Sequence, residues 1–257
     1  MPANSNVYTD SEVQRWYKPP DNLALSADEV HVWRASLNQL HLTLQYLHGI
    51  LASEERERAA RFYFERDRNN FIASRGLLRV ILGRYLNLQP GRLQIKYSSY
   101  GKPFLADDCG GEWLRFNVSH SGELALYAFS RGRELGIDIE EIRPEIAHQQ
   151  IAADFFSKQE IDALQALPAH LQQEAFFLCW TRKEAYIKGI GKGLSFPLHS
   201  FDVSLTPGAP ASLLAVRGDA EEAAHWTLQA LEPGPNYRAT LVVEGRGWQL
   251  KCLRWND

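Results

Sequence analysis

Two acidic residues stand two positions apart in the stretch GIDIEEI, and they are the first candidates for chemistry in this chain. In a strand, Asp138 and Glu140 point to the same face. Carboxylates held side by side repel one another unless a cation lies between them. Carboxylate oxygens suit Mg²⁺, which completes its coordination with water and phosphate oxygens. The pattern therefore indicates a magnesium site, and a solvated strand face is the alternative for an isolated pair of this kind.

A second cluster lies in CWTRKEAYIKGIGKGL, which reads as a helix that runs into a glycine-rich turn. Glu184 and Lys188 are four residues apart and so share one helical face. A carboxylate beside lysines and so much bare backbone suggests an anion and a metal ion held together. A surface ion pair is the alternative for these two residues. The turn lacks the GxxxxGK[ST] spacing and follows a helix, so a nucleotide-binding P-loop is excluded.

Other stretches add weaker candidates. In SKQE, Ser157 and Glu160 fit a capping box, which gives Glu160 a structural alternative to a catalytic role. In FNVSHSG, Ser119 and His120 are neighbours in an expected strand and point to opposite faces. They cannot form a nucleophilic Ser–His pair with each other, but both can hydrogen-bond a phosphate. Arginines recur every seven residues along an expected helix, a stripe that fits either phosphates or solvent, at Arg61, Arg68 and Arg75.

The elements that must position these residues follow from the periodicity of apolar side chains. Residues 53–86 have a helical pattern, and residues 113–130 read as a strand hairpin around a Ser–Gly turn. A strand over 133–144 precedes two further helices at 157–167 and 171–190. The remaining expected strands are 28–37, 199–205, 225–231, 237–243 and 248–255.

The order of these elements predicts an α+β fold built as a pseudo-twofold pair of similar halves. Each half would be an antiparallel sheet packed with helices, and the active site would lie in the cleft between the halves. We expect the N-terminal half to span residues 1–133, with residues 1–27 as an extended arm. The C-terminal half, which carries the metal-binding acids, would span residues 134–257.

Composition excludes several classes of protein. The chain has 257 residues, 45% of them hydrophobic and 23% charged, with a net charge of −3, so wholesale electrostatic binding to nucleic acid is not expected. No apolar run approaches the roughly 18 to 20 residues that span a bilayer, and no signal-peptide pattern opens the sequence. Three cysteines without CxxC spacing predict free thiols. We expect a cytoplasmic protein without nucleic-acid or membrane partners.

Taken in order, YGKPFL, FNVSHSG, GIDIEEI, FFSKQE and WTRKEAYIKGIGKGL resemble the 4′-phosphopantetheinyl transferases of the surfactin-synthetase type. The resemblance runs from about Ser53 to about Leu205. Enzymes of this family move the phosphopantetheine arm of coenzyme A (CoA) onto a serine of an apo acyl or peptidyl carrier protein and release 3′,5′-ADP. The resemblance thus implies Mg²⁺ as cofactor, CoA as substrate, a carrier protein as partner and a monomeric enzyme.

The resemblance also implies a role for each motif residue. The metal-binding acids would be Asp138, Glu140 and Glu184. CoA would be bound by Arg75, Lys102, Ser119, His120, Asp138 and Lys188, with Arg75 and His120 near its 3′-phosphate. The catalytic residues would be Glu160, Glu184 and Lys188. Whether Glu160 or a water held by Glu184 accepts the proton of the incoming serine stays open, and Arg58 and Arg61 are left out of the CoA-binding set.

Two other functions compete with transfer. One is a non-catalytic CoA-binding regulatory module, which has no evident need for Glu184 beside Lys188. The other is a Mg²⁺-dependent hydrolase, which would release 3′,5′-ADP without a carrier. For a transferase, the segment from Arg143 to Phe156 is the expected docking surface for the acidic helix that carrier proteins present beside their target serine.

Overall fold

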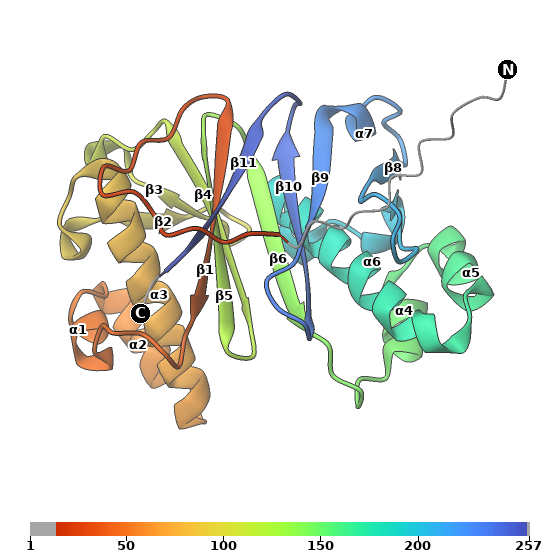
Figure 1. The fold of residues 1–257 in the computed structure, drawn as a ribbon, viewed down its shortest axis with the longest axis horizontal. Helices are drawn as coiled ribbons and strands as arrows, with labels where there is room; N and C mark the ends of the chain where they lie inside the picture. Colours follow the sequence, from red (N-terminus) through yellow and green to blue (C-terminus); the bar gives the residue numbers. More distant parts are fainter. Residues whose placement is uncertain (1–13, 256–257) are drawn as a thin grey trace, which may run out of the picture.

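The computed structural model describes residues 14–255 and shows two main sheets side by side between two groups of helices (Figure 1). The first sheet has the strand order β11-β1-β5-β4 and the second has the order β6-β10-β9. The strands of the first sheet are β1 (Glu29–Ser36), β4 (Leu114–Ser121), β5 (Leu124–Arg131) and β11 (Gln249–Arg254). Those of the second are β6 (Leu135–Glu141), β9 (Trp226–Leu231) and β10 (Tyr237–Glu244). Two short hairpins pair β2 (Ile95–Tyr97) with β3 (Pro103–Leu105) and β7 (Phe201–Val203) with β8 (Leu213–Val216).

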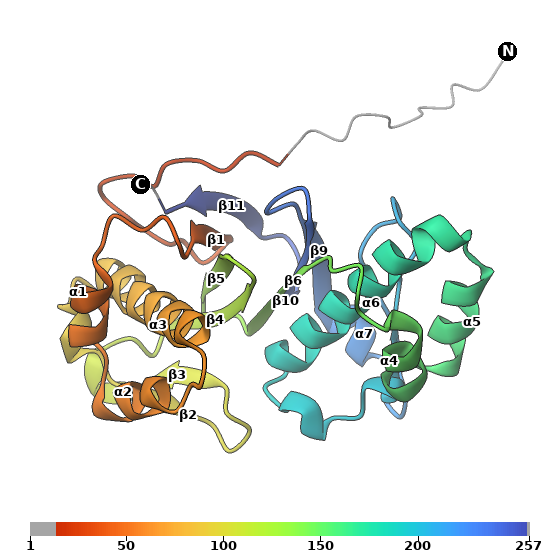
Figure 2. The same cartoon turned by 90° about the horizontal axis from the view of Figure 1, so that it is seen from below.

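The helices cover the outer faces of the two sheets (Figure 2). On the first sheet lie α1 (Leu44–Gly49), α2 (Ser53–Ala60) and α3 (Glu65–Leu86). On the second lies α6 (Ala169–Gly189), and α4 (His148–Phe155) and α5 (Lys158–Ala166) pack against α6. The short α7 (Glu222–His225) lies beside β8 and β9. Four 3₁₀ turns complete the described elements: Pro90–Arg92, Asp107–Cys109, Gly193–Ser195 and Leu198–Ser200. No helix within residues 14–255 is both long and apolar enough to cross a membrane.

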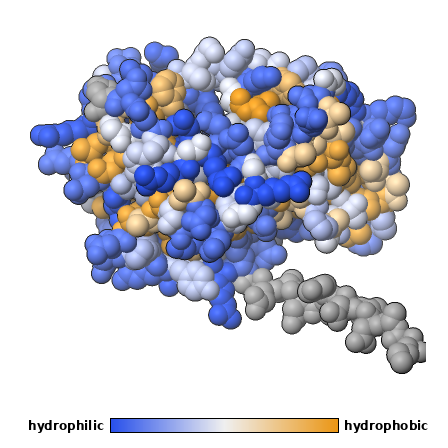
Figure 3. Space-filling view, turned by 90° about the horizontal axis from the view of Figure 1, so that it is seen from above, coloured by the Kyte–Doolittle hydropathy of each residue, from blue (hydrophilic) through white to orange (hydrophobic). Residues whose placement is uncertain are grey.

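The core has three parts because both faces of each main sheet are buried. Because successive side chains of β5 point to opposite faces, this strand contributes to two parts of the core. Tyr127 and Phe129 pack against the α1–α3 side, whereas Leu126 and Ala128 pack against the second sheet. The third part lies between the second sheet and α6. On the outside, the face seen from above is mostly hydrophilic, and its apolar groups form separate patches (Figure 3).

The two main sheets meet where β4 lies beside β6, and side chains join them there. Alternate side chains of β4 accept hydrogen bonds from alternate backbone N–H groups of β6. These bonds join Asn117 Oδ1 to Ile137 N (2.9 Å), Ser119 Oγ to Ile139 N (3.4 Å) and Ser121 Oγ to Glu141 N (3.1 Å). We call Asn117, Ser119 and Ser121 the polar seam. It occupies N–H groups that would otherwise be buried without a partner.

The α+β fold with antiparallel sheets packed by helices is confirmed. The helical pattern expected over residues 53–86 is confirmed as two helices, since the chain leaves α2 at Ala60 and starts α3 at Glu65. Phe64 has extended backbone angles at the start of α3, and Phe62 turns inward to pack on Phe71, with ring centroids 5.4 Å apart. Packing of these aromatic rings thus takes precedence over a helical pattern that continues through them.

The division into halves at residue 134 and the twofold relation between them stay predictions. One strand crosses that division, since β11 pairs with β1 in parallel and completes the first sheet. Of the expected N-terminal arm, residues 1–13 lie outside the described part. Residues 14–27 contain no helix or strand beyond an isolated bridge between Tyr17 and Leu253.

Helix α6 approaches β6 most closely at Gly136. A Cβ atom placed there would overlap the carbonyl oxygen of Ala185 and the backbone nitrogen of Gly189. Both of these groups are backbone and cannot move aside, so only glycine allows this approach. The packing matters for function because β6 and α6 carry the candidate acids.

We predict that Gly136→Ala lowers the free energy of unfolding by about 3 kcal/mol or more, at the upper end of overpacking costs. Gly49→Ala is the matched control, because a Cβ at Gly49 would have nothing within 4 Å. It should leave stability unchanged or raise it by up to about 1 kcal/mol. Urea denaturation of the two variants measures both effects, and equal stability would contradict the close approach.

Candidate active site

Four charged side chains face one another where β6 packs on α6. Ile137 and Ile139 of β6 point into the core between the sheets. The residues that follow each of them, Asp138 and Glu140, therefore point to the α6 side. There α6 presents Lys188, whose Nζ lies 2.6 Å from Asp138 Oδ1. The charge of Asp138 also acts on the carboxyl of Glu184, one helical turn before Lys188. The structure thus brings the three predicted metal ligands and the predicted lysine into one cluster.

The polar seam holds this cluster from the other side. The hydroxyl of Ser119 donates to Asp138 Oδ1 (2.9 Å) and accepts from Lys188 Nζ (3.1 Å). The hydroxyl of Ser121 donates to Glu140 Oε2 (2.9 Å). Ser119 is therefore engaged with protein groups, although its predicted role was to bind CoA. Ser121 was not among the predicted site residues, and its alternation with Ser119 along β4 was the available signal.

The acids carry more negative charge than one lysine can neutralise. Burial and the charge of Asp138 raise the pKa of Glu184 to about 7, and they also raise the pKa of Glu140. Burial alone would lower the pKa of Lys188, but the three carboxylates together raise it, so the amine stays protonated. Neighbouring carboxylates of this kind favour a bound cation, because a cation relieves their repulsion.

The donor set fits a magnesium ion. Asp138 Oδ2 is buried and has no hydrogen-bond partner among residues 14–255, so one oxygen of the cluster is free to coordinate. Glu140 and Glu184 supply further carboxylate oxygens, the ligand type that Mg²⁺ prefers. Within the described residues, no three acidic, histidine or cysteine side chains already enclose a metal position. A bound ion would therefore have to draw the carboxylates together.

Cations continue from this cluster toward the α2–α3 side. His120 lies on β4, and its pKa is lowered by desolvation in the surrounding protein and by the positive charges of Lys188, Arg75 and Arg58. Arg75 Nη1 is buried without a partner among the described residues. We call Lys188, His120, Arg75 and Arg58 the cationic track. It can hold two separated anionic groups of one ligand.

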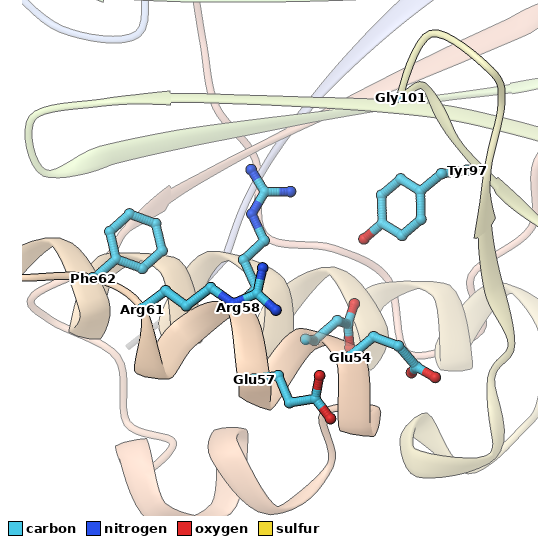
Figure 4. Close-up of a pocket in the computed structure, with 8 residues that line it drawn as sticks. Glu54, Glu57, Arg58, Arg61, Phe62, Tyr97 and Gly101 are labelled. Atoms are coloured by element: carbon cyan, nitrogen blue, oxygen red, sulfur yellow. The ribbon is translucent and has the colours of Figure 1, made fainter.

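A hollow of about 750 Å³ opens beside the track (Figure 4). Figure 4 shows Arg58 and Arg61 on one side of this hollow and Tyr97 on the other. The guanidinium of Arg75 lies 5.7 Å from the centre of the Tyr97 ring. The hollow is lined by Glu54, Glu55, Glu57, Arg58, Arg61, Phe62, Tyr97 and Gly101. Its aromatic ring and guanidinium groups suit a flat base with a phosphate beside it.

The arginine stripe expected from the sequence is divided. Arg61 lies just beyond α2, and Arg68 lies within 3.9 Å of Glu65 on the surface. Arg79, one turn beyond Arg75, is buried and donates from Nε to Glu55 Oε2 (2.6 Å). Only part of the stripe therefore faces the hollow.

Lys102 lies in the loop of the β2–β3 hairpin, and its side chain joins this hairpin to the end of α6. Its Nζ donates to Glu134 Oε2 (2.8 Å) and to the carbonyl oxygen of Gly189 (2.8 Å). A Cβ on Gly191 would lie 3.3 Å from Cδ of Lys102, so the glycine-rich turn passes close to the hairpin. The structure thus gives Lys102 and the turn a connecting role, and it does not join Lys102 to the acid cluster.

Glu160 lies apart from the cluster and is fully engaged. Its Oε2 accepts from Ser157 N (2.9 Å) in the predicted capping box and pairs with Lys183 Nζ (2.8 Å). Its Oε1 accepts from Val203 N (2.9 Å), and the side chain is 2% exposed. The capping alternative therefore describes Glu160 in this structure. Lys183 precedes Glu184 on α6 but points into the core, which sequence reasoning missed.

Stability should depend on pH through Glu184. Its pKa is raised to about 7 in the folded chain from an ordinary value of 4.5, so the folded state binds this proton more tightly. The resulting stability is fully present below the unfolded pKa and is lost as pH rises through about 7. We predict that the urea midpoint of metal-free protein falls between about pH 5 and about pH 8. Glu184→Gln should flatten this fall, and an unchanged slope in that variant would contradict the raised pKa.

The Glu160–Lys183 pair offers a second test. We predict that Glu160→Gln alone costs about 3–5 kcal/mol of stability, because it leaves the Lys183 ammonium buried without a counter-charge. Adding Lys183→Met should recover most of this loss. If Glu160 is not the catalytic base, the stable double variant keeps kcat/KM within about threefold of the parent. A stable but inactive double variant would restore Glu160 as the base.

Comparison with known proteins assigns the chain to a family. Residues 134–242 match the family described as the 4′-phosphopantetheinyl transferase superfamily. Residues 31–131 match the family described as 4′-phosphopantetheinyl transferase, N-terminal. A solved structure of holo-[acyl-carrier-protein] synthase from Thermotoga maritima superposes only loosely, with a TM-score of 0.35 and 19% identity over 43% of this chain and 62% of that chain, and adds nothing to the assignment.

Three curated relatives are similar to this chain. The 4′-phosphopantetheinyl transferase HetI of Nostoc sp. is 43% identical over 92% of this chain and 96% of its own length. The 4′-phosphopantetheinyl transferase Sfp of Bacillus subtilis is 36% identical over 64% of this chain and 71% of its own. The human L-aminoadipate-semialdehyde dehydrogenase-phosphopantetheinyl transferase is 31% identical over 60% of this chain and 52% of its own. This chain therefore belongs to the 4′-phosphopantetheinyl transferase superfamily.

Proposed function

We propose that this enzyme transfers the 4′-phosphopantetheine arm of CoA to a serine of an apo carrier protein, with Mg²⁺ as cofactor. The observation that carries the proposal is the junction of the acid cluster with the cationic track through Lys188. CoA has two anionic groups, a pyrophosphate and a 3′-phosphate, separated by a ribose. The pyrophosphate suits Lys188 and the metal-binding acids, whereas the 3′-phosphate suits His120 and Arg75.

The adenine end of CoA suits the hollow beside the track. Arg58 and Arg61 reach this hollow, as Figure 4 shows, and Tyr97 offers a ring for stacking. Arg75 supplies a buried Nη1 without a partner among the described residues, and an anion would remove that cost. We therefore add Arg58 and Tyr97 to the CoA-binding residues. Lys102 and Ser119 would act indirectly, since both are engaged with protein groups.

The reaction forms one bond and breaks one. The serine Oγ of the carrier bonds to the phosphorus that bears the pantetheine arm, and the bond from that phosphorus to the bridging oxygen of 3′,5′-ADP breaks. The partner brings the nucleophile, so the chain needs only to orient the pyrophosphate and to accept a proton. Lys188 would hold the phosphate oxygens as charge moves onto the leaving group.

Asp138, Glu140 and Glu184 would hold the Mg²⁺. When bound, the ion would neutralise phosphate charge and polarise the phosphorus–oxygen bonds. The proton of the serine would go to Glu184 or to a water that it holds, because the buried Glu160 has both oxygens engaged.

The carrier would dock along residues 143–156, which include α4. Arg143 is exposed at the start of this segment and offers a positive charge to an acidic helix. Phe155 at its end is 41% exposed and packs edge-on against Trp180, with ring centroids 5.7 Å apart. An arginine and an exposed aromatic ring on one segment are residue types enriched in docking surfaces.

We further propose a cytoplasmic monomer made of the two halves 1–133 and 134–257. One chain supplies the acid cluster and the whole cationic track, so the site needs no second copy. The two family matches meet between residues 131 and 134, which supports the division. All three cysteines, which lie in the described part, are free thiols, as a reducing compartment favours. The net charge of −3 offers no general attraction for nucleic acid.

The decisive experiment is intact-mass spectrometry of several apo carrier proteins incubated with the enzyme, CoA and Mg²⁺. We expect a mass gain of one phosphopantetheine group per carrier and an equal amount of 3′,5′-ADP. The gain should disappear with chelator and in Asp138→Asn, but not in the control Asp162→Asn, whose carboxylate is exposed and pairs with Lys158.

The other functions give different results. CoA binding without any mass gain or 3′,5′-ADP would support the regulatory module and reject transfer. Release of 3′,5′-ADP without a carrier would support the hydrolase. Charge reversal at Arg143 should raise the KM for the carrier and leave the KM for CoA unchanged, and an unchanged carrier KM would reject the docking surface.

A further inference from the structure

Ser121 touches the acid cluster but has no part in the proposed chemistry. It is 7% exposed at the end of β4. Its oxygen accepts the N–H of Glu141 (3.1 Å), which fixes the hydroxyl against β6. Its single proton points to Glu140 Oε2 at 2.9 Å. A hydroxyl has only one proton to donate. Because the oxygen already accepts the N–H of Glu141, the backbone of β6 fixes the hydroxyl so that its proton points to Glu140.

The turn after β4 fixes this arrangement from two sides. Gly122 has φ of +55°, and a Cβ there would come within 3 Å of the side chains of Glu141 and Tyr237. From α3, Asn70 Nδ2 donates to the carbonyl oxygen of Gly122 (3.2 Å). The hairpin end is therefore held between the two halves, and Ser121 has little freedom to turn away from Glu140.

Glu140 needs such a partner because the neighbouring carboxylate of Asp138 repels it. Without a hydrogen bond, Glu140 would swing toward solvent, since it lies near the end of β6 and is only half-buried. The bond from Ser121 holds the carboxylate beside Asp138 before any ion arrives. Hydrogen bonds to metal-ligating carboxylates orient the ligands and raise affinity in this way.

We propose that Ser121 is a positioning residue that orients Glu140 for a divalent cation and thereby sets the affinity of the site for that ion. The inference rests on the proposed metal site, and it extends that site to a residue that the acid motif does not include. Ser121 acts through Glu140 and makes no contact with the reacting atoms.

Asn117 is the matched control within the same seam. It is 4% exposed, lies on the same face of β4, and accepts the N–H of Ile137 (2.9 Å). Its side chain makes no hydrogen bond to a carboxylate within the described residues. Asn117→Ala therefore removes a seam bond as Ser121→Ala does, but it leaves Glu140 untouched.

The test measures Mn²⁺ binding to the metal-free, full-length enzyme, with free Mn²⁺ followed by electron paramagnetic resonance. We expect Ser121→Ala to weaken Mn²⁺ binding about tenfold, the lower end of such effects. Ser121→Thr should restore binding to near the parent value. If Ser121→Ala does not fold, Ser121→Val replaces it, because Val and Thr have the same shape and differ by the hydroxyl.

The Mg²⁺ dependence of turnover is a second measurement, and a merely structural role of Ser121 would not change it. The Mg²⁺ concentration for half-maximal activity should rise about tenfold in Ser121→Ala, while kcat at saturating Mg²⁺ stays near the parent value. Asn117→Ala should lower the urea midpoint but leave both metal constants unchanged.

The outcomes distinguish failure of the positioning role from failure of the proposed metal site. Parent-like Mn²⁺ affinity in Ser121→Ala, with loss of binding in Asp138→Asn, rejects the positioning role alone. Equal weakening in Ser121→Ala and Asn117→Ala also rejects it, since the cause would then be general loosening of the seam. Absence of Mn²⁺ binding in the parent enzyme rejects the metal site and the positioning role together.

Discussion

The edge of β6 that faces β4 is the constraint on which the rest of this structure depends. Its backbone N–H groups are buried between two sheets, and each would cost about 1–3 kcal/mol if left without a partner. A backbone ladder would merge the sheets into one continuous surface. Instead, three short polar side chains of β4 accept the bonds, and the two sheets keep separate strand orders. Two of these side chains, Ser119 and Ser121, then reach the carboxylates of β6, so the seam that joins the two sheets also arranges the acids.

Two neighbouring residues of helix α6 point to different places, one into the core and one to the acid cluster. Lys183 points into the core, where its charge must be paired, and Glu160 and two backbone carbonyl oxygens surround it. The next residue, Glu184, points to the acid cluster. A second buried pair, Arg79 with Glu55, fixes α2 on α3 beneath the hollow. Breaking buried pairs of this kind is costly, so they act as rigid supports on either side of the site.

Between these supports, charged groups extend from the acid cluster to the arginines on the α2–α3 side. The acid cluster and Lys188 lie at one end, and the arginines of α2 and α3 lie at the other. His120 stands between them, and desolvation together with the positive charges around it lowers its pKa. The glycine-rich turn that suggested a phosphate loop instead lets the β2–β3 hairpin approach α6. The bare backbone of this turn therefore serves the contact between the β2–β3 hairpin and the end of α6.

The sequence alone determined the element types, the α+β class and the family, because alternation and helical spacing specify which side chains share a face. That was enough to bring Asp138 and Glu140 to one side of β6 and to pair Glu184 with Lys188 along α6. Tertiary structure decided the partners. It paired Glu160 with the buried Lys183, joined Lys102 to Glu134 and to the end of α6, and ended α2 before α3. The reason is physical: spacing along a chain tells where a side chain points within its element, but a hydrogen bond or ion pair between distant elements exists only once packing has brought both groups together.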